Sequence, residues 1–343
     1  MPVEIVVDAM GSDRAPESEI RGAILAARAL DVKIALVGPE ETIRPALEAA
    51  LQSAARVRWF EQISKRITIV HASEWITMTD KAAQAVRSKR DSSMRVGLKR
   101  VREGVSQGFF TAGNTGAAMA TAKMVLGGLA GVDRPALATF FPTSTGTPTL
   151  LLDVGANVDS DPENLLQFAV MGSMYAQNVF NIPSPRVGLL SIGEEDSKGN
   201  TLTRDTLPMM RALPSLNFIG NVEGRDLFNG TADVIVCDGF VGNVALKTSE
   251  GVAKLVSVSL REALKSTVTS QVGALLSRAA FSDFKKRLDY SEYGGAPLLG
   301  VRGVCIVGHG SSSDKAVMNG IRVAAEFAQA NVNAGIEAAL AKP

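Results

Sequence analysis

The 343-residue chain carries 36 Lys and Arg against 35 Asp and Glu, a formal net charge of +1, and 46% of its residues are hydrophobic. This balance excludes the broad positive field with which proteins attract nucleic acid, so an acidic partner must meet a local basic patch. The chain is longer than the length at which a single hydrophobic core usually divides. We therefore expect two lobes, and the chain can pass between them more than once.

Cysteine usage and the chain start indicate the compartment. Cys237 and Cys305 both lie in apolar runs, with no second pair for a zinc site or a disulfide framework. Residues 1–8 place an acid inside their apolar run and have no basic segment before it, so we expect no ordinary signal peptide. No uncharged apolar run approaches membrane-spanning length. The sequence therefore predicts a cytoplasmic protein.

Short β-branched runs alternate with longer amphipathic or Ala-rich segments, which predicts a mainly parallel sheet flanked by helices. In the first part we expect strands at residues 3–7, 33–37, 67–70 and 108–111, and helices at 17–30 and 41–54. Three further helices are expected: one capped by Thr79 and Asp80, one that begins at Arg95, and one that follows the 113–116 turn and ends near Leu126. Residues 135–141 and 147–152 predict two strands joined as a hairpin or a sheet crossing.

The alternation continues after residue 152. Asp161 caps and Pro162 begins a helix expected at 162–179. Further strands are expected at 186–192, 232–237 and 301–307, and helices at 203–213, 242–267, 272–288 and after 313. The two long helices predict a projecting helical hairpin over about 243–290.

Gly-punctuated polar turns follow several of these strands. They lie at 113–116, 153–159, 193–200, 238–243 and 308–313. Such a turn before a helix presents unpaired N–H groups and a positive dipole end, which suit phosphate or a developing oxyanion. We expect these turns to converge on one site. The 113–116 turn has neither the P-loop spacing nor the Rossmann fingerprint, and taken alone it is more often structural.

The histidines and Lys198 are the candidate charged groups. His309 lies between two glycines before three serines, and can serve an anion or act as acid or base, or be an ordinary loop histidine. His71 follows a strand and is expected to be structural. Lys198 lies among Glu194, Glu195 and Asp196, where it can neutralise phosphate or simply be solvated.

Two other chemistries are weaker. The same acids could join Asp153 or Asp159 around a hard metal ion, but no metal-specific spacing is present, and we expect none. Cys237 could be an acyl-accepting nucleophile, but it ends an apolar strand without a neighbouring base, which favours a buried thiol.

Seven motifs carry a resemblance that spans nearly the whole chain. They are Asp8-Ala-Met-Gly, Ala112-Gly-Asn-Thr-Gly-Ala, Leu152-Asp-Val-Gly-Ala-Asn-Val-Asp, Ile192-Gly-Glu-Glu, Phe218-Ile-Gly-Asn-Val-Glu-Gly, Val236-Cys-Asp-Gly-Phe-Val-Gly-Asn-Val and Gly294-Gly-Ala-Pro-Leu-Leu-Gly. In order and spacing the chain resembles the PlsX family of bacterial phosphate acyltransferases. It departs at Ser12, where the family usually has a second Gly, and over about 266–290.

The resemblance implies one α/β catalytic unit, 1–343, of two interwoven lobes, similar to isopropylmalate dehydrogenases and phosphotransacetylases and usually a homodimer. It implies transfer of a fatty acyl group from acyl carrier protein to inorganic phosphate. The product, acyl phosphate, would feed a downstream membrane glycerol-phosphate acyltransferase in phospholipid synthesis. No cofactor is implied.

Once these substrates are granted, the residue roles follow from charge and position. Phosphate is already a nucleophile and a thioester has a good leaving group, so positioning and charge neutralisation suffice. We expect the following roles: phosphate cradled by Gly113, Asn114, Thr115, Gly116, Ser311 and Ser312; catalysis by Lys198, Asn243 and His309; and orientation of the turns by Asp153 and Asn157.

Partners follow in the same way. An acidic carrier protein needs a basic patch, for which Arg95, Lys99, Arg100 and Arg102, or the cluster at 278–287, are candidates. The apolar and basic mixture at 272–288 suits an anionic membrane surface or a dimer interface.

Two rival functions remain from other classes. A decarboxylating hydroxyacid dehydrogenase shares the implied fold but needs a nicotinamide cofactor and a divalent metal. A peripheral scaffold would bind carrier protein and lipid without turnover.

Overall fold

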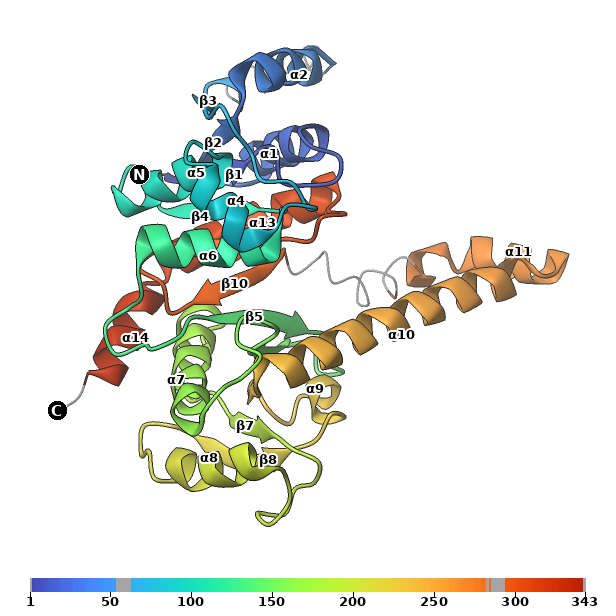
Figure 1. Ribbon diagram of the computed structural model, residues 1–343. Helices are drawn as coiled ribbons and strands as arrows, with labels where there is room; N and C mark the ends of the chain where they lie inside the picture. The colour runs from blue at the N-terminus through green and yellow to red at the C-terminus, as the bar shows by residue number, and fades with distance from the viewer. Residues whose placement is uncertain (1, 54–62, 282–283, 285–293, 342–343) are drawn as a thin grey trace.

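The structure is a computed structural model that describes residues 2–53, 63–281, 284 and 294–341 (Figure 1). The strands are β1 (Val3–Asp8), β2 (Val32–Gly38), β3 (Ile67–His71), β4 (Gly108–Thr111), β5 (Ala136–Phe141), β6 (Thr149–Leu152), β7 (Val187–Leu190), β8 (Phe218–Val222), β9 (Val234–Val236), β10 (Ala296–Leu299) and β11 (Val304–Val307). The helices are α1 (Glu17–Ala29), α2 (Glu40–Ser53), α4 (Ala82–Ser88), α5 (Ser93–Arg102), α6 (Thr115–Leu126), α7 (Pro162–Val179), α8 (Thr201–Arg211), α9 (Asp226–Asn229), α10 (Gly239–Lys265), α11 (Val268–Leu276), α13 (Asp314–Gln329) and α14 (Val332–Leu340).

The strands form one sheet in the order β3-β2-β1-β4-β11-β10-β5-β6-β9-β7-β8. Its parallel pairings lie at the two ends, and the three antiparallel pairings, β11–β10, β10–β5 and β5–β6, lie between them. Three successive reversals leave the strands from β3 to β11 running opposite to those from β6 to β8. The predicted mainly parallel α/β fold is confirmed, and β5 and β6 are the antiparallel hairpin predicted from the sequence.

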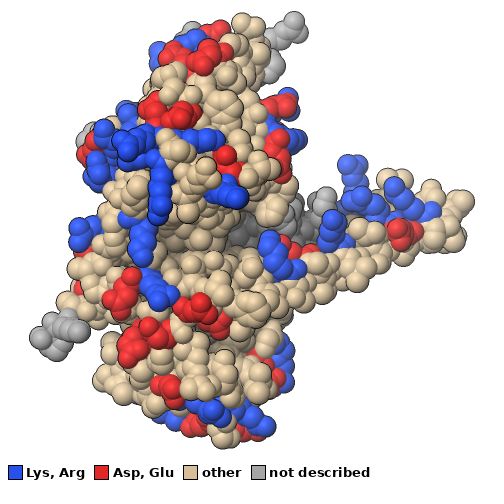
Figure 2. Space-filling view, in the orientation of Figure 1, with Lys and Arg blue, Asp and Glu red and all other residues tan. Residues whose placement is uncertain are grey.

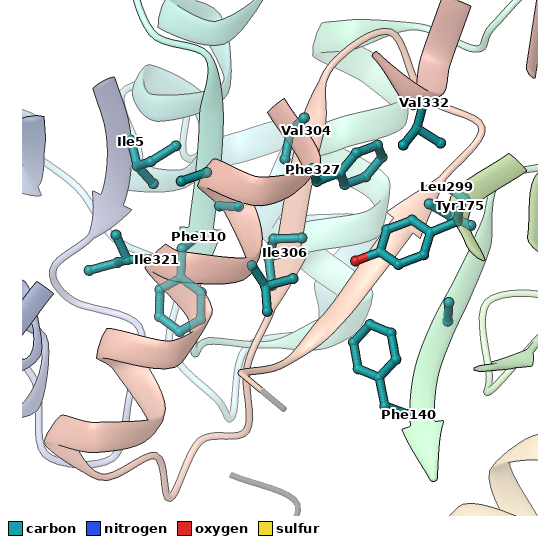
Figure 3. Packing of buried hydrophobic residues seen from close by; sticks show 14 of the residues in the cluster. Ile5, Phe110, Phe140, Tyr175, Leu299, Val304, Ile306, Ile321, Phe327 and Val332 are labelled. Carbon is teal, nitrogen blue, oxygen red and sulfur yellow. The ribbon is translucent and has the colours of Figure 1, made fainter. Parts of the chain in front are cut away.

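A shared aromatic core joins the two ends of the sheet. Tyr175 of α7 is 1% exposed. Its ring centroid lies 5.9 Å from that of Phe140 in β5 and 5.4 Å from that of Phe327 in α13 (Figure 3). Because α7 packs on β6 and β9 whereas α13 packs on β1, β4 and β11, this cluster spans both parallel groups. The lobes are therefore packed on each other through buried side chains.

The helices α10 and α11 project from the sheet as the predicted hairpin (Figure 1). With 27 residues, α10 is about 40 Å long. It begins three residues earlier than predicted, because the Asp238 carboxylate caps it by accepting hydrogen bonds from the N–H groups of Phe240 and Val241. The second helix was predicted at 272–288, but α11 spans Val268–Leu276 because Thr267 caps it; most of 282–293 lies outside the described residues.

Other boundaries correct the sequence reading. The predicted cap at Thr79 and Asp80 is wrong: α4 begins after Lys81 without a side-chain cap. Asp80 instead accepts a hydrogen bond from the Thr77 N–H and pairs with Lys89 at 2.6 Å. The short elements β8, α9 and β10 were not predicted. Within the described part of the chain, no helix combines the length and apolar character needed to cross a bilayer.

Two glycines in α10 provide a matched stability test. A Cβ at Gly242 would lie 1.9 Å from the Asp153 carbonyl oxygen, whereas a Cβ at Gly251 would meet nothing within 4 Å. We expect Gly242→Ala to lower the free energy of unfolding by about 2–3 kcal/mol through overpacking. Gly251→Ala should raise it by about 0.5–1 kcal/mol through helix propensity. Urea unfolding checks both, and a Gly242→Ala protein as stable as wild type would contradict the close approach.

Candidate active site

A hollow of about 190 Å³ lies where the two lobes meet. The first lobe contributes Thr115 at the start of α6 and His309 and Ser312 in the loop after β11. The second lobe contributes Asn243 and Lys247 from α10. The remaining lining comes from Leu137, Thr139, Phe140, Val154, Leu246, Glu250, Gly294, Gly295, Ala296, Val307, Gly308 and Ala316. The structure thus brings together Thr115, Asn243, His309 and Ser312, four residues that the sequence had singled out.

The loop after β11 fixes the ring of His309. Its Nδ1 accepts a hydrogen bond from the Ser311 N–H at 3.2 Å and lies 2.9 Å from Ser311 Oγ. With Nδ1 as an acceptor, the neutral ring carries its proton on Nε2. The Ser312 hydroxyl donates to the His309 carbonyl oxygen at 2.5 Å. Ser311, which we expected to bind phosphate, therefore orients the imidazole and does not line the hollow.

The 113–116 turn is both a cap and a source of open donors. The Asn114 side chain caps α6 by accepting from the Ala117 N–H at 3.0 Å, and it donates to the Asp80 carbonyl oxygen at 3.1 Å. The Gly113 N–H donates to Thr111 Oγ1. Among the described residues, the N–H groups of Thr115 and Gly116 have no acceptor. Within the 113–116 turn, these two N–H groups at the positive end of α6 are therefore the ones that can donate hydrogen bonds to an anion.

The start of α10 contributes side chains instead of backbone donors. Its first N–H groups are already used, by Asp238 and by the Asn157 carbonyl oxygen, which accepts from Gly239 at 2.8 Å. Asn243 and Lys247 lie one turn apart on the face toward the hollow, and Lys247 Nζ is 2.8 Å from Glu250. Lys247 was missed in the sequence, although its i,i+4 spacing from Asn243 on a predicted helix was a usable signal.

The turn after β6 holds this part of the site in place. The buried carboxylate of Asp153 accepts four hydrogen bonds, from the N–H groups of Leu137, Ala156 and Asn157 and from Asn157 Nδ2. Burial raises the pKa of Asp153, and the four donors oppose that shift. Asn157 Nδ2 also donates to the Pro135 carbonyl oxygen at 2.8 Å. These contacts fasten the turn to the start of β5.

Lys198 is not brought into the hollow. It is exposed in the turn between β7 and α8 and is absent from the residues that line the hollow. Two of the neighbouring acids pair with arginines, Glu194 with Arg225 and Asp196 with Arg211, each at 2.7 Å. The catalytic role of Lys198 stays a prediction.

The alternative chemistries gain no support from the described residues. Those residues contain no cluster of three His, Cys, Asp or Glu side chains suited to a metal ion. Cys237 is buried, and burial raises the pKa of its thiol, which makes it a poor nucleophile.

His71, which we expected to be structural, lies at the end of β3. Its Nδ1 accepts a hydrogen bond from the Glu40 N–H at 3.3 Å.

Behind the 113–116 turn lies a buried pair of acids that sequence reasoning did not single out. Asp8 Oδ2 accepts from Thr111 Oγ1 at 2.8 Å, and Glu19 Oε1 accepts from the Ser12 N–H at 2.9 Å. Glu19 is fully buried and its Oε2 has no partner among the described residues. Burial raises the pKa of both carboxyl groups, that of Glu19 to about 7. A Cβ at Gly11 would lie 2.9 Å from the Gly113 nitrogen, so the loop that these acids support packs directly on the turn.

Comparison with known proteins places the chain in a family. The family model described as "Fatty acid synthesis protein" matches residues 3–335. The chain belongs to this family. A relative from Acidobacterium capsulatum, named phosphate acyltransferase, is 67% identical over 343 residues, which are 100% of this chain and 98% of the relative. The resemblance read from the motifs is confirmed, and the protein is an acyltransferase of lipid synthesis.

Solved structures show the same fold at low identity. A phosphotransacetylase from Streptococcus pyogenes superposes with a TM-score of 0.64 at 15% identity, covering 96% of this chain and 94% of that chain. A 4-hydroxythreonine-4-phosphate dehydrogenase from Klebsiella pneumoniae superposes with a TM-score of 0.51 at 13% identity, covering 96% and 99%. The expected phosphotransacetylase-like fold is therefore confirmed, and the dehydrogenase that shares it is a 4-hydroxythreonine-4-phosphate dehydrogenase.

The buried acid pair makes stability depend on pH. Folded Glu19 keeps its proton up to about pH 7, whereas the unfolded chain releases it near 4.5. Its contribution to stability is therefore fully present below pH 4.5 and falls by about 3 kcal/mol as the pH rises to 7. Glu19→Gln removes this loss and should unfold at higher urea concentration than wild type at pH 8, with a smaller difference at pH 5. Glu17→Gln, at an exposed position in α1, is the control; equal pH dependence of Glu19→Gln and wild type would contradict the assignment.

Proposed function

We propose that the protein transfers a fatty acyl group from acyl carrier protein to inorganic phosphate and so forms acyl phosphate. The observation that carries this proposal is the hollow, which combines Thr115, whose N–H is open at the start of α6, with Asn243, Lys247 and His309. The names of its relatives support phosphate as the acceptor. We further propose that a membrane glycerol-phosphate acyltransferase consumes the product.

In the proposed reaction a phosphate oxygen attacks the thioester carbonyl carbon directly. The new C–O bond forms as the C–S bond breaks, and the proton of hydrogen phosphate passes to the leaving thiolate. Phosphate lies at the Thr115 and Gly116 N–H groups, with Lys247 reducing its repulsion toward the carbonyl oxygen as that oxygen gains charge. His309, with its proton on Nε2, donates to that oxygen or to the sulfur.

In this mechanism, most of the rate acceleration comes from positioning phosphate against the thioester carbonyl. No covalent acyl-enzyme is needed, because phosphate is a competent nucleophile, and the buried thiol of Cys237 is unsuited to be one. At about 190 Å³ the hollow is smaller than the roughly 300–1,000 Å³ usual for a whole drug-sized ligand. It therefore suits the reacting head of the substrates, with the acyl chain extending outside.

Variants of the hollow test these roles. We expect Asn243→Ala and Lys247→Met to lower kcat by about 10²–10³-fold, the usual cost of losing a group that stabilises the transition state. Lys254→Met, two turns further along α10, is the matched control, and Lys198→Ala tests the turn after β7. Hydroxylamine trapping of acyl phosphate and release of carrier thiol are measured together. Wild-type kinetics in the Asn243 and Lys247 variants would remove the hollow from the mechanism, and wild-type kinetics in Lys198→Ala would remove that residue.

The same assay, with a nicotinamide-binding measurement beside it, separates the rival functions. Phosphate-dependent thiol release supports the acyltransferase. A scaffold leaves acyl carrier protein and phosphate unreacted, and a dehydrogenase quenches the fluorescence of a reduced nicotinamide on binding it.

The hairpin supports two further proposals about assembly. Val252, Leu255 and Val258 of α10 are 43–65% exposed, and Leu275 and Leu276 of α11 are 70% and 83% exposed. We propose that the apolar residues of α10 pair two copies of the chain in a homodimer. We also propose that Leu275 and Leu276 contact the surface of the cytoplasmic membrane peripherally.

A double variant at the tip separates these proposals. Leu275→Ser/Leu276→Ser should lower flotation with anionic liposomes at least several-fold and leave the sedimentation coefficient unchanged. Val105→Ser, at a residue 52% exposed in the first lobe, is the control. Unchanged flotation would refute the membrane contact, and a shift to monomer would assign the tip to the dimer instead.

A further inference from the structure

A second hollow, of about 530 Å³, lies on the first lobe and is strongly basic. Its charged lining consists of Arg90, Arg95, Lys99 and Arg102, with Asp91 as the single carboxylate and His71 beside it. Val96, Met124 and Val125 supply an apolar part. Lys and Arg side chains gather over α5 on this face of the molecule (Figure 2).

The charges of this basic hollow are largely uncompensated. Within the described part of the chain, no carboxylate lies within ion-pair distance of Arg90, Arg95 or Arg102. Lys99 reaches Glu103 only at 3.7 Å, between two exposed side chains. Since the whole chain has a net charge of only +1, this is a local concentration of positive charge.

Neighbouring acids offset this charge only in part, because Asp91 is the one carboxylate in the described lining and faces four cationic side chains. Asp91 is occupied as an acceptor for the Ser73 N–H and hydroxyl, at 2.8 and 2.6 Å. Arg100, which the sequence had grouped with the other cations of α5, pairs with Glu4 at 2.8 Å and does not line the hollow. Arg95, Lys99 and Arg102 follow the i, i+4, i+7 spacing of one helix face.

Helix α6 connects this basic hollow to the active site. Thr115 at its first residue lines the active-site hollow, and Met124 near its last turn lines the basic hollow. Met124 lies nine helical steps after Thr115, a rise of about 14 Å. Between them, Ala120 and Lys123 are exposed and Met119 is half-buried. An extended chain can therefore lie along α6 from one hollow to the other.

We propose that the basic hollow docks the acidic surface of the acyl carrier protein, whose thiol-bearing arm lies along α6 and delivers the thioester to Thr115. This inference rests on the proposed function and adds the docking surface to it. Charge complementarity is the argument for this occupant: the acidic carrier meets unpaired guanidinium groups, which steer its approach and set its orientation. The apolar part contributed by Met124 and Val125 covers the root of the arm.

Charge reversal at the rim tests the docking surface. We expect Arg95→Glu/Arg102→Glu to lower kcat/KM for the acylated carrier at least tenfold at low salt, and to raise the Kd of fluorescently labelled carrier protein by a similar factor. The KM for phosphate should not change, since the anion site lies at the other end of α6. The defect should shrink as the salt concentration rises toward 0.5 M, on the order at which the Debye length falls below about 5 Å. Arg204→Glu, at an exposed residue of α8 in the second lobe, is the control, and thermal unfolding verifies that each variant is folded.

Three results overturn the proposal in distinguishable ways. Unchanged carrier kinetics and binding in the double variant, with an active wild type, refute the docking surface and leave the proposed function standing. Loss of binding to anionic vesicles with unchanged carrier kinetics assigns the basic hollow to the membrane. A wild type that releases no thiol with carrier and phosphate refutes the proposed function itself, whatever the labelled carrier does.

Discussion

The arrangement of the candidate active site depends on the buried carboxylate of Asp153. With four donors and no competing partner, it holds the turn after β6 in one conformation and ties it to the first residues of β5. Gly239 and Gly242 let α10 approach that turn so closely that side chains at either position would collide with it. The positions of Asn243 and Lys247 therefore depend on Asp153, a hydrogen-bonded acid that does not itself line the hollow.

Each lobe brings a different kind of group to the hollow. The first lobe brings Thr115, whose N–H is open at the start of α6, and the imidazole fixed by Ser311. The second brings an amide and an ammonium group on the side of α10, whose own N-terminus is already capped. Both lobes are thus needed to line the hollow, and they share one continuous sheet that reverses direction between β11 and β6.

Local chemistry was readable from the sequence where short-range rules decide the structure. Asp161 and Pro162 predicted the start of α7, and its capping box shows why. The Gly-punctuated turns read from the sequence include those at Thr115, Asn243 and His309, which meet in the hollow. Contacts between distant segments were not readable: Lys89 takes Asp80 away from the cap that its position suggested, and Glu4 takes Arg100 out of the basic face.

Some elements were hidden by their composition. β10 is four residues long and contains Pro297, a residue that normally argues against an interior strand, yet β11 and β5 flank it. Lys247 looked like an ordinary polar position of a long helix, and only the fold shows that it faces Thr115 and His309 of the first lobe across the hollow. Lys198 illustrates the reverse case, because a conspicuous charged turn lies outside the lining of the hollow.

The aromatic cluster of Tyr175, Phe140 and Phe327 bears on how the molecule moves. Hinge-bending enzymes open by separating lobes whose contact is thin and polar, whereas here three rings bridge the lobes inside the core. Opening that joint would expose them to water, at a cost of several kcal/mol. The lobes should therefore behave as one cooperative unit in amide exchange, and access to the hollow should depend on loop movement and not on separation of the lobes.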